Sequence, residues 1–177
     1  MPNGFRVYDS AYPHFITCSI VYWIPVFRRE DYFLLLADSL RYCIERKGLR
    51  VHGYVIMPDH FHALSSVESG LLPDVVRDLK KHTSKAIAGK LEEEGRTLWL
   101  NAMRRAAGAS GGVSVWNPDY HPEQVHTRAF FEQKLRYMHE NPVRAGFVND
   151  PSEWRYSSAA AYYRDGESLV PITGIEW

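Results

Sequence analysis

The chain has 177 residues, of which 45% are hydrophobic and 14% aromatic, so general disorder is excluded and one domain with a substantial core is expected. Its 21 basic and 21 acidic residues cancel, so the net charge alone does not indicate a nucleic-acid binder, although binding depends more on how charge is distributed than on its sum. Two cysteines, Cys18 and Cys43, are too few for a disulfide framework, and a reducing compartment is expected.

Neither a membrane span nor a signal peptide is predicted. The longest apolar stretch, residues 15–27, is far shorter than a membrane span and contains Pro25. The first residues, MPNGFRVYDSAYP, lack the basic start and apolar core of a signal peptide. We therefore expect a soluble cytoplasmic protein without a membrane partner.

The first half of the chain predicts a strand, a helix and a hairpin. β-Branched and aromatic residues favour a strand over 14–21. Apolar residues at helical spacing, an acidic start and a closing glycine predict a helix over 29–48. Residues 49–57 and 60–67 predict two strands joined by a Pro-Asp turn.

The second half predicts two longer helices and a fourth strand. The elements are a helix over 73–94, a flexible glycine-rich loop over 101–114, a strand over 113–120, a helix over 127–141 and a short tail helix over 157–166. The helix over 127–141 should break at Asn141, because a residue before proline avoids the α region.

This order of elements predicts an α+β protein. The expected architecture is a ferredoxin-like antiparallel sheet, β-α-β-β-α-β, with helices on one face and an additional C-terminal helix that carries Tyr137. The sequence has no internal repeat and no sign of a second domain, so residues 1–177 predict a single domain.

Two histidines stand close together in the stretch YVIMPDHFHAL, residues 54–64. Residues i and i+2 of a strand lie on one face, so His60 and His62 should point the same way and Phe61 into the opposite layer. Two imidazoles can form one wall of a metal site and leave room for a third protein ligand and substrate oxygens. A lone His-x-His is more often a pair of half-exposed strand residues, so a third ligand and a nucleophile have to be found elsewhere.

The last long helix supplies candidates for both. Tyr137 and Asn141 stand four residues apart and share one helix face. Phe131, Leu135 and Met138 form an adjacent apolar stripe that could dock the helix on the sheet. On spacing alone, the simpler interpretation of Tyr137 is a tyrosine at the edge of the core, one of eleven in the chain.

A basic face is predicted on the helix over 73–94. Arg77, Lys80, Lys81 and Lys85 gather opposite its apolar side. Such a face could follow a DNA phosphate backbone. A solvated helix surface is at least as simple an interpretation for each lysine.

The two motifs together carry a family resemblance. MPDHFHAL and YMHENPVRAGFV closely resemble the REP-associated tyrosine transposases, relatives of the small single-strand transposases in the HUH nuclease superfamily. HFITCSI, LKKHTSKAI, VWNPDYHPEQV and WRYSSAAAYY fit as well. The resemblance covers residues 12–163, and the combination is far more specific than either motif alone.

The resemblance implies a metal-dependent endonuclease and strand transferase that acts on single-stranded, hairpin-forming repeats of bacterial DNA. Tyr137 maps onto the family's nucleophile, which forms a 5′-phosphotyrosine. His60, His62 and Asn141 map onto the metal ligands, and Mg²⁺ or Mn²⁺ is the implied cofactor. Because Asn141 precedes Pro142, its amide could point towards the metal or away from it.

Further expectations follow from the same resemblance. Arg144, inside the tyrosine motif, is the better candidate for a phosphate contact near the site. Both a monomer and a homodimer are compatible with the family, and a nucleoid-associated location is implied. Imidazoles bind metal only when neutral, so activity should fall as the pH drops through the histidine range. Asp59 is interpreted as a turn residue.

Two other functions stay open. A hairpin-binding protein on the same fold would not cut DNA, although such a binder needs no set of His60, His62, Tyr137 and Asn141 together. A small metallohydrolase would use the histidines and a water molecule. It would leave no protein–DNA adduct and would survive Tyr137→Phe.

Overall fold

The computed structural model describes residues 9–175 and 177. The strands are β1 (His14–Ser19), β2 (Leu49–Ile56), β3 (His60–Val67) and β4 (Glu123–Gln124). The helices are α1 (Glu30–Lys47), α2 (Leu72–Glu93), α3 (Thr97–Ala107), α4 (Arg128–His139), α5 (Asn141–Arg144) and α6 (Ala159–Tyr163). Short 3-10 turns are η1 (Val21–Trp23), η2 (Gly108–Ser110) and η3 (Pro151–Glu153).

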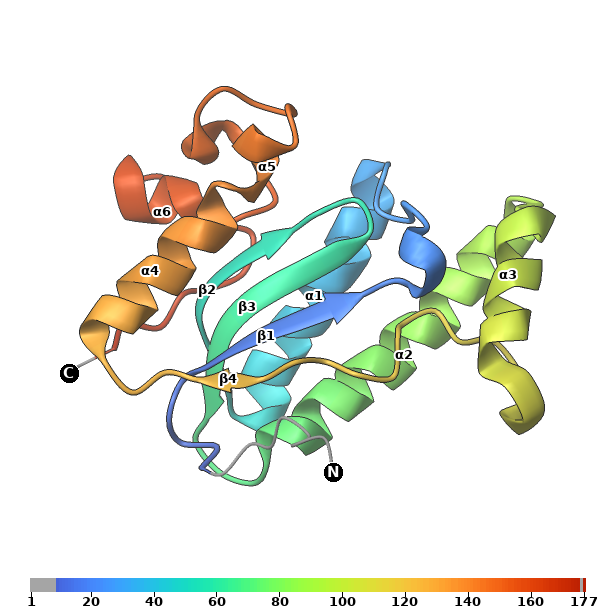
Figure 1. Cartoon of the computed structure of the whole chain (residues 1–177), viewed down its shortest axis with the longest axis horizontal. Helices are drawn as coiled ribbons and strands as arrows, with labels where there is room; N and C mark the ends of the chain where they lie inside the picture. Colours follow the sequence, from blue (N-terminus) through green and yellow to red (C-terminus); the bar gives the residue numbers. More distant parts are fainter. Residues whose placement is uncertain (1–8, 176) are drawn as a thin grey trace.

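The strands form one antiparallel sheet, which confirms the α+β class (Figure 1). Their order is β2-β3-β1-β4, so β3 lies between the two strands that α1 connects. The register between β1 and β3 pairs Thr17 with His62 and Ser19 with His60. Because side chains alternate along each strand, paired residues of β1 and β3 point to the same face of the sheet.

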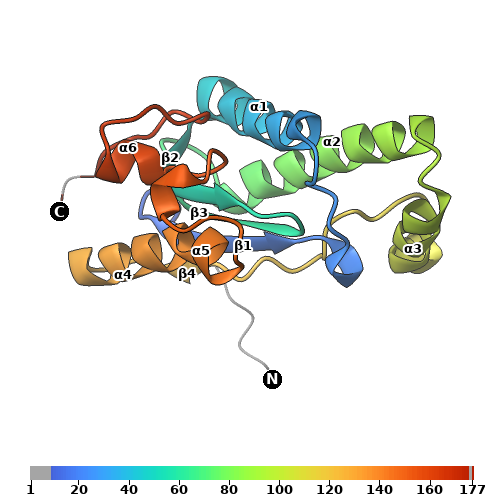
Figure 2. The same ribbon diagram turned by 90° about the horizontal axis from the view of Figure 1, so that it is seen from above.

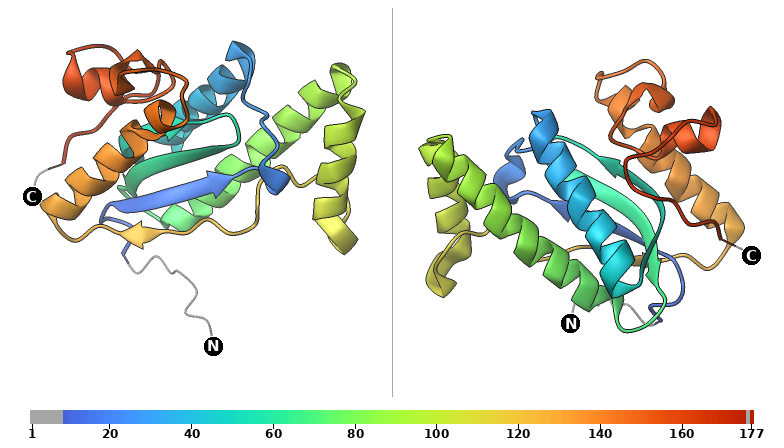
Figure 3. Two further views of the ribbon diagram at one scale, coloured as in Figure 1. Left: turned by 45° about the horizontal axis from the view of Figure 1, so that its top comes forward. Right: turned by 180° about the vertical axis from the view of Figure 1, so that it is seen from behind.

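Helices cover both faces of the sheet. In Figure 2, α1 and α2 lie on one face and α4 on the other, and Figure 3 shows α1 beside α2 from behind. Ile16, Phe61 and Ala63 belong to the larger core beneath α1 and α2. Phe15 and Leu64, on the opposite face, belong to a second core with the apolar stripe of α4. Among residues 9–175 and 177, none of the helices has the length and hydrophobicity of a membrane-spanning segment.

The prediction of a flexible loop over 101–114 is wrong for its first half. Residues 97–107 form α3, which packs against α2. The segment NAMRRAA consists mainly of good helix formers, and the glycines that signal a loop begin only at Gly108. Leu100 and Met103 are buried and fix the helix on the core.

The fourth strand is displaced from its predicted position at 113–120. Trp116 forms an isolated bridge with Ile20, and regular pairing with β1 occurs only at β4, residues 123–124. Pro118 and Pro122 lie between these two contacts. Proline has no N–H to donate, so the edge of the sheet is interrupted there.

The predicted break before Pro142 occurs slightly earlier in the chain. α4 ends at His139, and Glu140 separates it from α5, which begins at Asn141 with Pro142 in its first turn. Glu140 keeps right-handed dihedral angles, φ −78° and ψ −12°. The chain therefore continues nearly helically, and Asn141 stays one turn beyond Tyr137.

The turn η1 follows β1 and is conformationally strained. Tyr22 and Trp23 have φ of 55° and 53°, in the left-handed region that bulky residues rarely adopt, at a cost on the order of 1 kcal/mol each. The Val21 N–H donates to Val115 O at 2.9 Å. Ile20 and Ile24, on either side, are buried.

Gly53 sets how closely α4 approaches β2. A Cβ at this position would lie 2.6 Å from Leu135 Cδ1 and 2.6 Å from Met138 Cε.

We expect Gly53→Ala to lower the free energy of unfolding by about 1–3 kcal/mol through overpacking. Gly89→Ala is the matched control: this exposed helical site has nothing within 4 Å of a new Cβ. It should gain about 0.5–1 kcal/mol from helix propensity. Urea denaturation measures both, and equal changes would contradict this packing.

Candidate active site

His60 and His62 project from the start of β3 towards α4. Their ring centroids lie 4.9 Å apart, at an interplanar angle of 71°. Phe61 between them is fully buried in the opposite core, where its ring meets Trp116. The histidines therefore share one face of the strand, as the sequence predicts. His62 is 5% exposed, whereas His60 is only partly buried.

Tyr137 meets this histidine pair from α4. Its ring centroid lies 5.7 Å from that of His62 and 6.1 Å from that of Phe15. The side chain is 43% exposed, because its neighbours Leu135 and Met138 carry the packing of the helix. The structure thus brings Tyr137 to a histidine pair that lies more than seventy positions earlier in the sequence, and it leaves the tyrosine accessible.

Each imidazole is held through its Nδ1 atom. His60 Nδ1 lies 2.6 Å from the Asp59 carboxylate, and His62 Nδ1 lies 2.8 Å from Thr17 Oγ1. If each Nδ1–H donates in these bonds, the lone pair of each Nε2 is free for a ligand. Asp59 is therefore more than the turn residue expected from sequence. The role of Thr17 in orienting His62 could not be predicted from the sequence, because only the strand register shows that the two residues face each other.

Asn141 lies on the same cleft as Tyr137 and His60. This cleft has a volume of about 610 Å³, and Asp59, Arg144 and neighbouring residues also line it. Asn141 Nδ2 donates to Tyr137 O at 3.2 Å. In this conformation the amide group folds back on α4, so its ligand role stays a prediction.

Arg144 contacts the tyrosine directly. Its guanidinium lies 4.6 Å from the centroid of the Tyr137 ring, and Nη2 donates to Tyr137 O at 2.5 Å. The cation therefore sits beside the hydroxyl-bearing ring on the wall of the cleft. This is a suitable position for holding a phosphate, as the sequence motif predicts.

The donor set is compatible with a divalent metal but incomplete. No group of three or more His, Cys, Asp or Glu side chains could hold a metal ion in the described part of the chain. Two imidazoles and a nearby amide remain, together with the Asp59 carboxylate that orients one ring. Substrate oxygens would have to complete the coordination.

The surroundings of His62 favour its neutral form. Burial is the main cause that lowers the pKa of His62 to about 3, followed by electrostatic effects of His60 and of the cations Lys134 and Arg144. The pKa of His62 therefore lies below the ordinary histidine range, and the expected fall of activity with pH stays a prediction. The guanidinium of Arg144, which lines the cleft, favours binding of an anion there.

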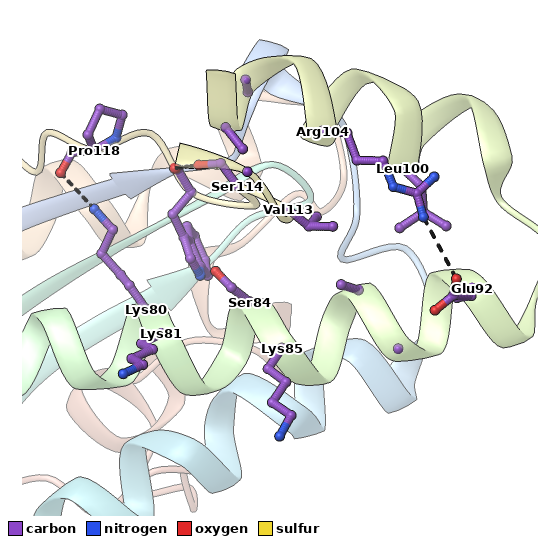
Figure 4. Close-up of a pocket in the computed structure, with 16 residues that line it drawn as sticks. Lys80, Lys81, Ser84, Lys85, Glu92, Leu100, Arg104, Val113, Ser114 and Pro118 are labelled. Carbon is purple, nitrogen blue, oxygen red and sulfur yellow. Dashed lines mark hydrogen bonds and ion pairs between the residues drawn. The ribbon is translucent and has the colours of Figure 1, made fainter. Parts of the chain in front are cut away.

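The basic face predicted on α2 is divided between several roles. Lys80 Nζ donates to Asn117 O at 2.6 Å and to Pro118 O at 2.9 Å, and burial lowers its pKa (Figure 4). Arg77 pairs with Asp74 and Asp78. Lys81 and Lys85 are exposed. With Lys80 they help to line a cleft of about 860 Å³ between α2 and α3 (Figure 4).

This face lies far from the candidate site in the fold. α2 covers the side of the sheet opposite α4 (Figure 2). Any DNA contact of Arg77, Lys80, Lys81 or Lys85 stays a prediction and would involve a part of the DNA other than the phosphate beside Tyr137.

Comparisons with known proteins agree with the motifs. The family model "Transposase IS200 like" matches residues 7–140. The REP-associated tyrosine transposase of Escherichia coli (strain K12) is 19% identical over 150 residues, covering 82% of this chain and 76% of that protein. The ISDra2 transposase TnpA of Deinococcus radiodurans is 29% identical over 108 residues, covering 59% and 69%.

A solved structure of a REP-associated tyrosine transposase bound to a REP hairpin has the same fold. Its TM-score with this chain is 0.66 at 16% identity, covering 99% of this chain and 94% of that one. The residues matched by the family model include His60, His62 and Tyr137 and end one position before Asn141.

The buried histidines predict a loss of stability in mild acid. Burial lowers the pKa of His62 to about 3 and that of His139 to about 4, against about 6.5 when unfolded. Between these values only the unfolded chain binds the protons. The free energy of unfolding should therefore fall as the pH drops from about 6.5 to about 4, by about 1.4 kcal/mol per pH unit for each histidine.

Urea denaturation between pH 7 and pH 5 measures this loss. NMR of the imidazole protons should show His62 not titrating above about pH 4 in the folded state and titrating near 6.5 in urea. A folded-state midpoint near 6.5 would contradict the buried environment described for His62.

Proposed function

Because this chain belongs to the IS200-like transposase family, we propose that it cuts and rejoins single-stranded DNA through Tyr137. The observation that carries the proposal is that Tyr137 and His60 line one cleft while the ring of His62 lies against that of Tyr137. The tyrosine ring lies 5.7 Å from the ring of His62, and both imidazoles are oriented through Nδ1. A protein that only binds DNA would need no such arrangement.

The proposed reaction is a transesterification. Tyr137 Oη attacks the scissile phosphorus, an Oη–P bond forms and the P–O3′ bond breaks. The phenolic proton passes to solvent, and the departing 3′-oxygen takes up a proton. The covalent 5′-phosphotyrosine conserves the bond energy, so a 3′-hydroxyl can later attack it and rejoin a strand.

The side chains around the tyrosine have separate tasks in this scheme. Arg144 holds the phosphate beside the attacking oxygen, and Asp59 and Thr17 keep His60 and His62 in a fixed orientation with Nε2 towards the ligand. His60, His62 and Asn141 would hold Mg²⁺ or Mn²⁺, which when bound supplies Lewis-acid stabilisation of the phosphate and the departing oxygen.

The proposed substrate is a hairpin-forming DNA repeat. The support is the likeness to REP-associated tyrosine transposases, one of which was solved with a REP hairpin. The half-exposed Tyr137 and the open cleft leave room for an unpaired strand. A protein that acts on chromosomal DNA would be located in the cytoplasm, at the nucleoid.

Loss of the tyrosine hydroxyl should abolish covalent capture of DNA. Wild-type protein with Mn²⁺ and end-labelled hairpin DNA from near its own gene should give an adduct on a denaturing gel. Tyr137→Phe and His62→Ala should each lower adduct formation by at least about a thousandfold, because nucleophile and metal act as a unit. Tyr12→Phe is a matched control, since this exposed tyrosine lies elsewhere on the chain.

The same gels separate the competing functions. Cleavage without an adduct that persists in Tyr137→Phe would indicate a metallohydrolase. Tight hairpin binding without cleavage under Mg²⁺ and Mn²⁺ would indicate a binding protein on the same fold. Either result would rule out the tyrosine mechanism.

Tyr137 and the histidine pair come together within one chain, and we propose that the site works in cis. Tyr137 and His62 already lie together, without a second copy. A mixture of Tyr137→Phe and His62→Ala proteins should therefore form no adduct. If adduct returned on mixing, the tyrosine helix of one chain would serve the histidines of another. Size-exclusion chromatography of each variant checks that the oligomeric state is unchanged.

A further inference from the structure

The strained turn η1 presents two large aromatic rings to solvent. The side chains of Tyr22 and Trp23 are 62% and 59% exposed, although both residues occupy left-handed backbone positions. Their neighbours Ile20, Val21 and Ile24 are buried and anchor the turn. Neither ring contributes much to the core, so packing does not account for keeping them in this conformation. Strain of this kind concentrates at functional sites.

The exposed rings adjoin the candidate active site. The ring of Trp23 stands edge-on to that of His60, with centroids 6.0 Å apart. Pro25, two residues further on, lines the same cleft as Tyr137. In Figure 1, η1 is the blue turn at the end of β1 that faces α3. It therefore lies next to the cleft, with Trp23 in contact with His60.

A second hollow lies on the other side of Tyr22. It has a volume of about 390 Å³ and is lined by Tyr22, Ile24, Leu98, Trp99, Ala102 and Arg105. Leu98 is 79% exposed, and Arg105 is exposed as well. Apolar and aromatic walls with one cation match a nucleobase whose phosphate lies at the rim.

We propose that η1 and α3 hold the unpaired DNA strand beside the cleavage site. Trp23 stacks on a base next to the scissile phosphate, and the hollow between Tyr22 and Trp99 takes a neighbouring base, with Arg105 against the backbone. The choice of DNA as occupant rests on the proposed function and on the continuity of these rings with the cleft at His60. Every base has a π face, so this contact would tolerate many sequences.

Equilibrium binding tests the contact without requiring cleavage. The probes are fluorescein-labelled oligo(dT) and an abasic strand of equal length, both measured in EDTA. Trp23→Gly should bind oligo(dT) about tenfold more weakly than wild type, the size of one lost stacking contact. Affinity for the abasic strand should be unchanged, as should the dependence of oligo(dT) binding on salt, because no charge is removed.

Glycine is chosen because it tolerates the backbone of this turn. With φ of 53° at Trp23, the substitution relieves strain, so the Tm should stay level or rise while DNA affinity falls. Tyr42→Ala is the matched control: this tyrosine on α1 is 57% exposed and borders a different pocket. Its affinity for oligo(dT) should equal that of wild type.

Several results would overturn the inference. One is equal affinity of wild type for oligo(dT) and the abasic strand, and another is unchanged oligo(dT) binding by Trp23→Gly. A change of oligomeric state in Trp23→Gly with DNA affinity intact would assign the rings to a contact between chains instead. A base-dependent loss in Trp23→Gly alongside failure of the adduct experiment would support the strand contact and reject the tyrosine chemistry.

Discussion

The pairing of β3 with β1 is the constraint on which the candidate site depends. Because side chains alternate along a strand, burial of Phe61 in the core beneath α1 and α2 forces His60 and His62 onto the opposite face. The register then sets Thr17 opposite His62. A shift of one residue would bury the histidines and expose Phe61, so the hydrophobic core itself holds the polar site in place.

The second half of the site depends on the docking of α4. Leu135 and Met138 close against the sheet at Gly53, where there is no Cβ to keep them apart. Tyr137, between them in sequence, is left on the flank of the helix beside His62. The position of the nucleophile candidate is therefore set by apolar packing two turns long, while its own side chain remains accessible.

Much of this arrangement could be predicted from sequence because it follows strong local periodicities. The period of two predicts the shared face of His60 and His62, and helical spacing predicts the docking stripe beside Tyr137. The contacts of Thr17 and Lys80 depend on strand register and on the path of residues 117–118, which local patterns do not encode. Pro118 and Pro122 can be read from the sequence, but the way they interrupt the fourth strand depends on its pairing with β1, which local patterns do not encode.

The family resemblance added what periodicity could not, namely that residues 60 and 137 belong to one site. No propensity connects positions so far apart, and a lone tyrosine on a helix carries little information. The geometry supplies an independent reason for the same grouping, because one cleft is lined by Tyr137, His60, Asn141 and Arg144.

Two adjacent residues with strained backbone angles lie close to the candidate site. Among residues 9–175 and 177, the only residues other than glycine with positive φ are Tyr22, Trp23 and Asp165. Two of the three are adjacent, aromatic and exposed, and one meets His60. A turn selected for stability alone would place glycine or asparagine there. Keeping two large rings at such positions is consistent with selection for a surface that contacts a ligand.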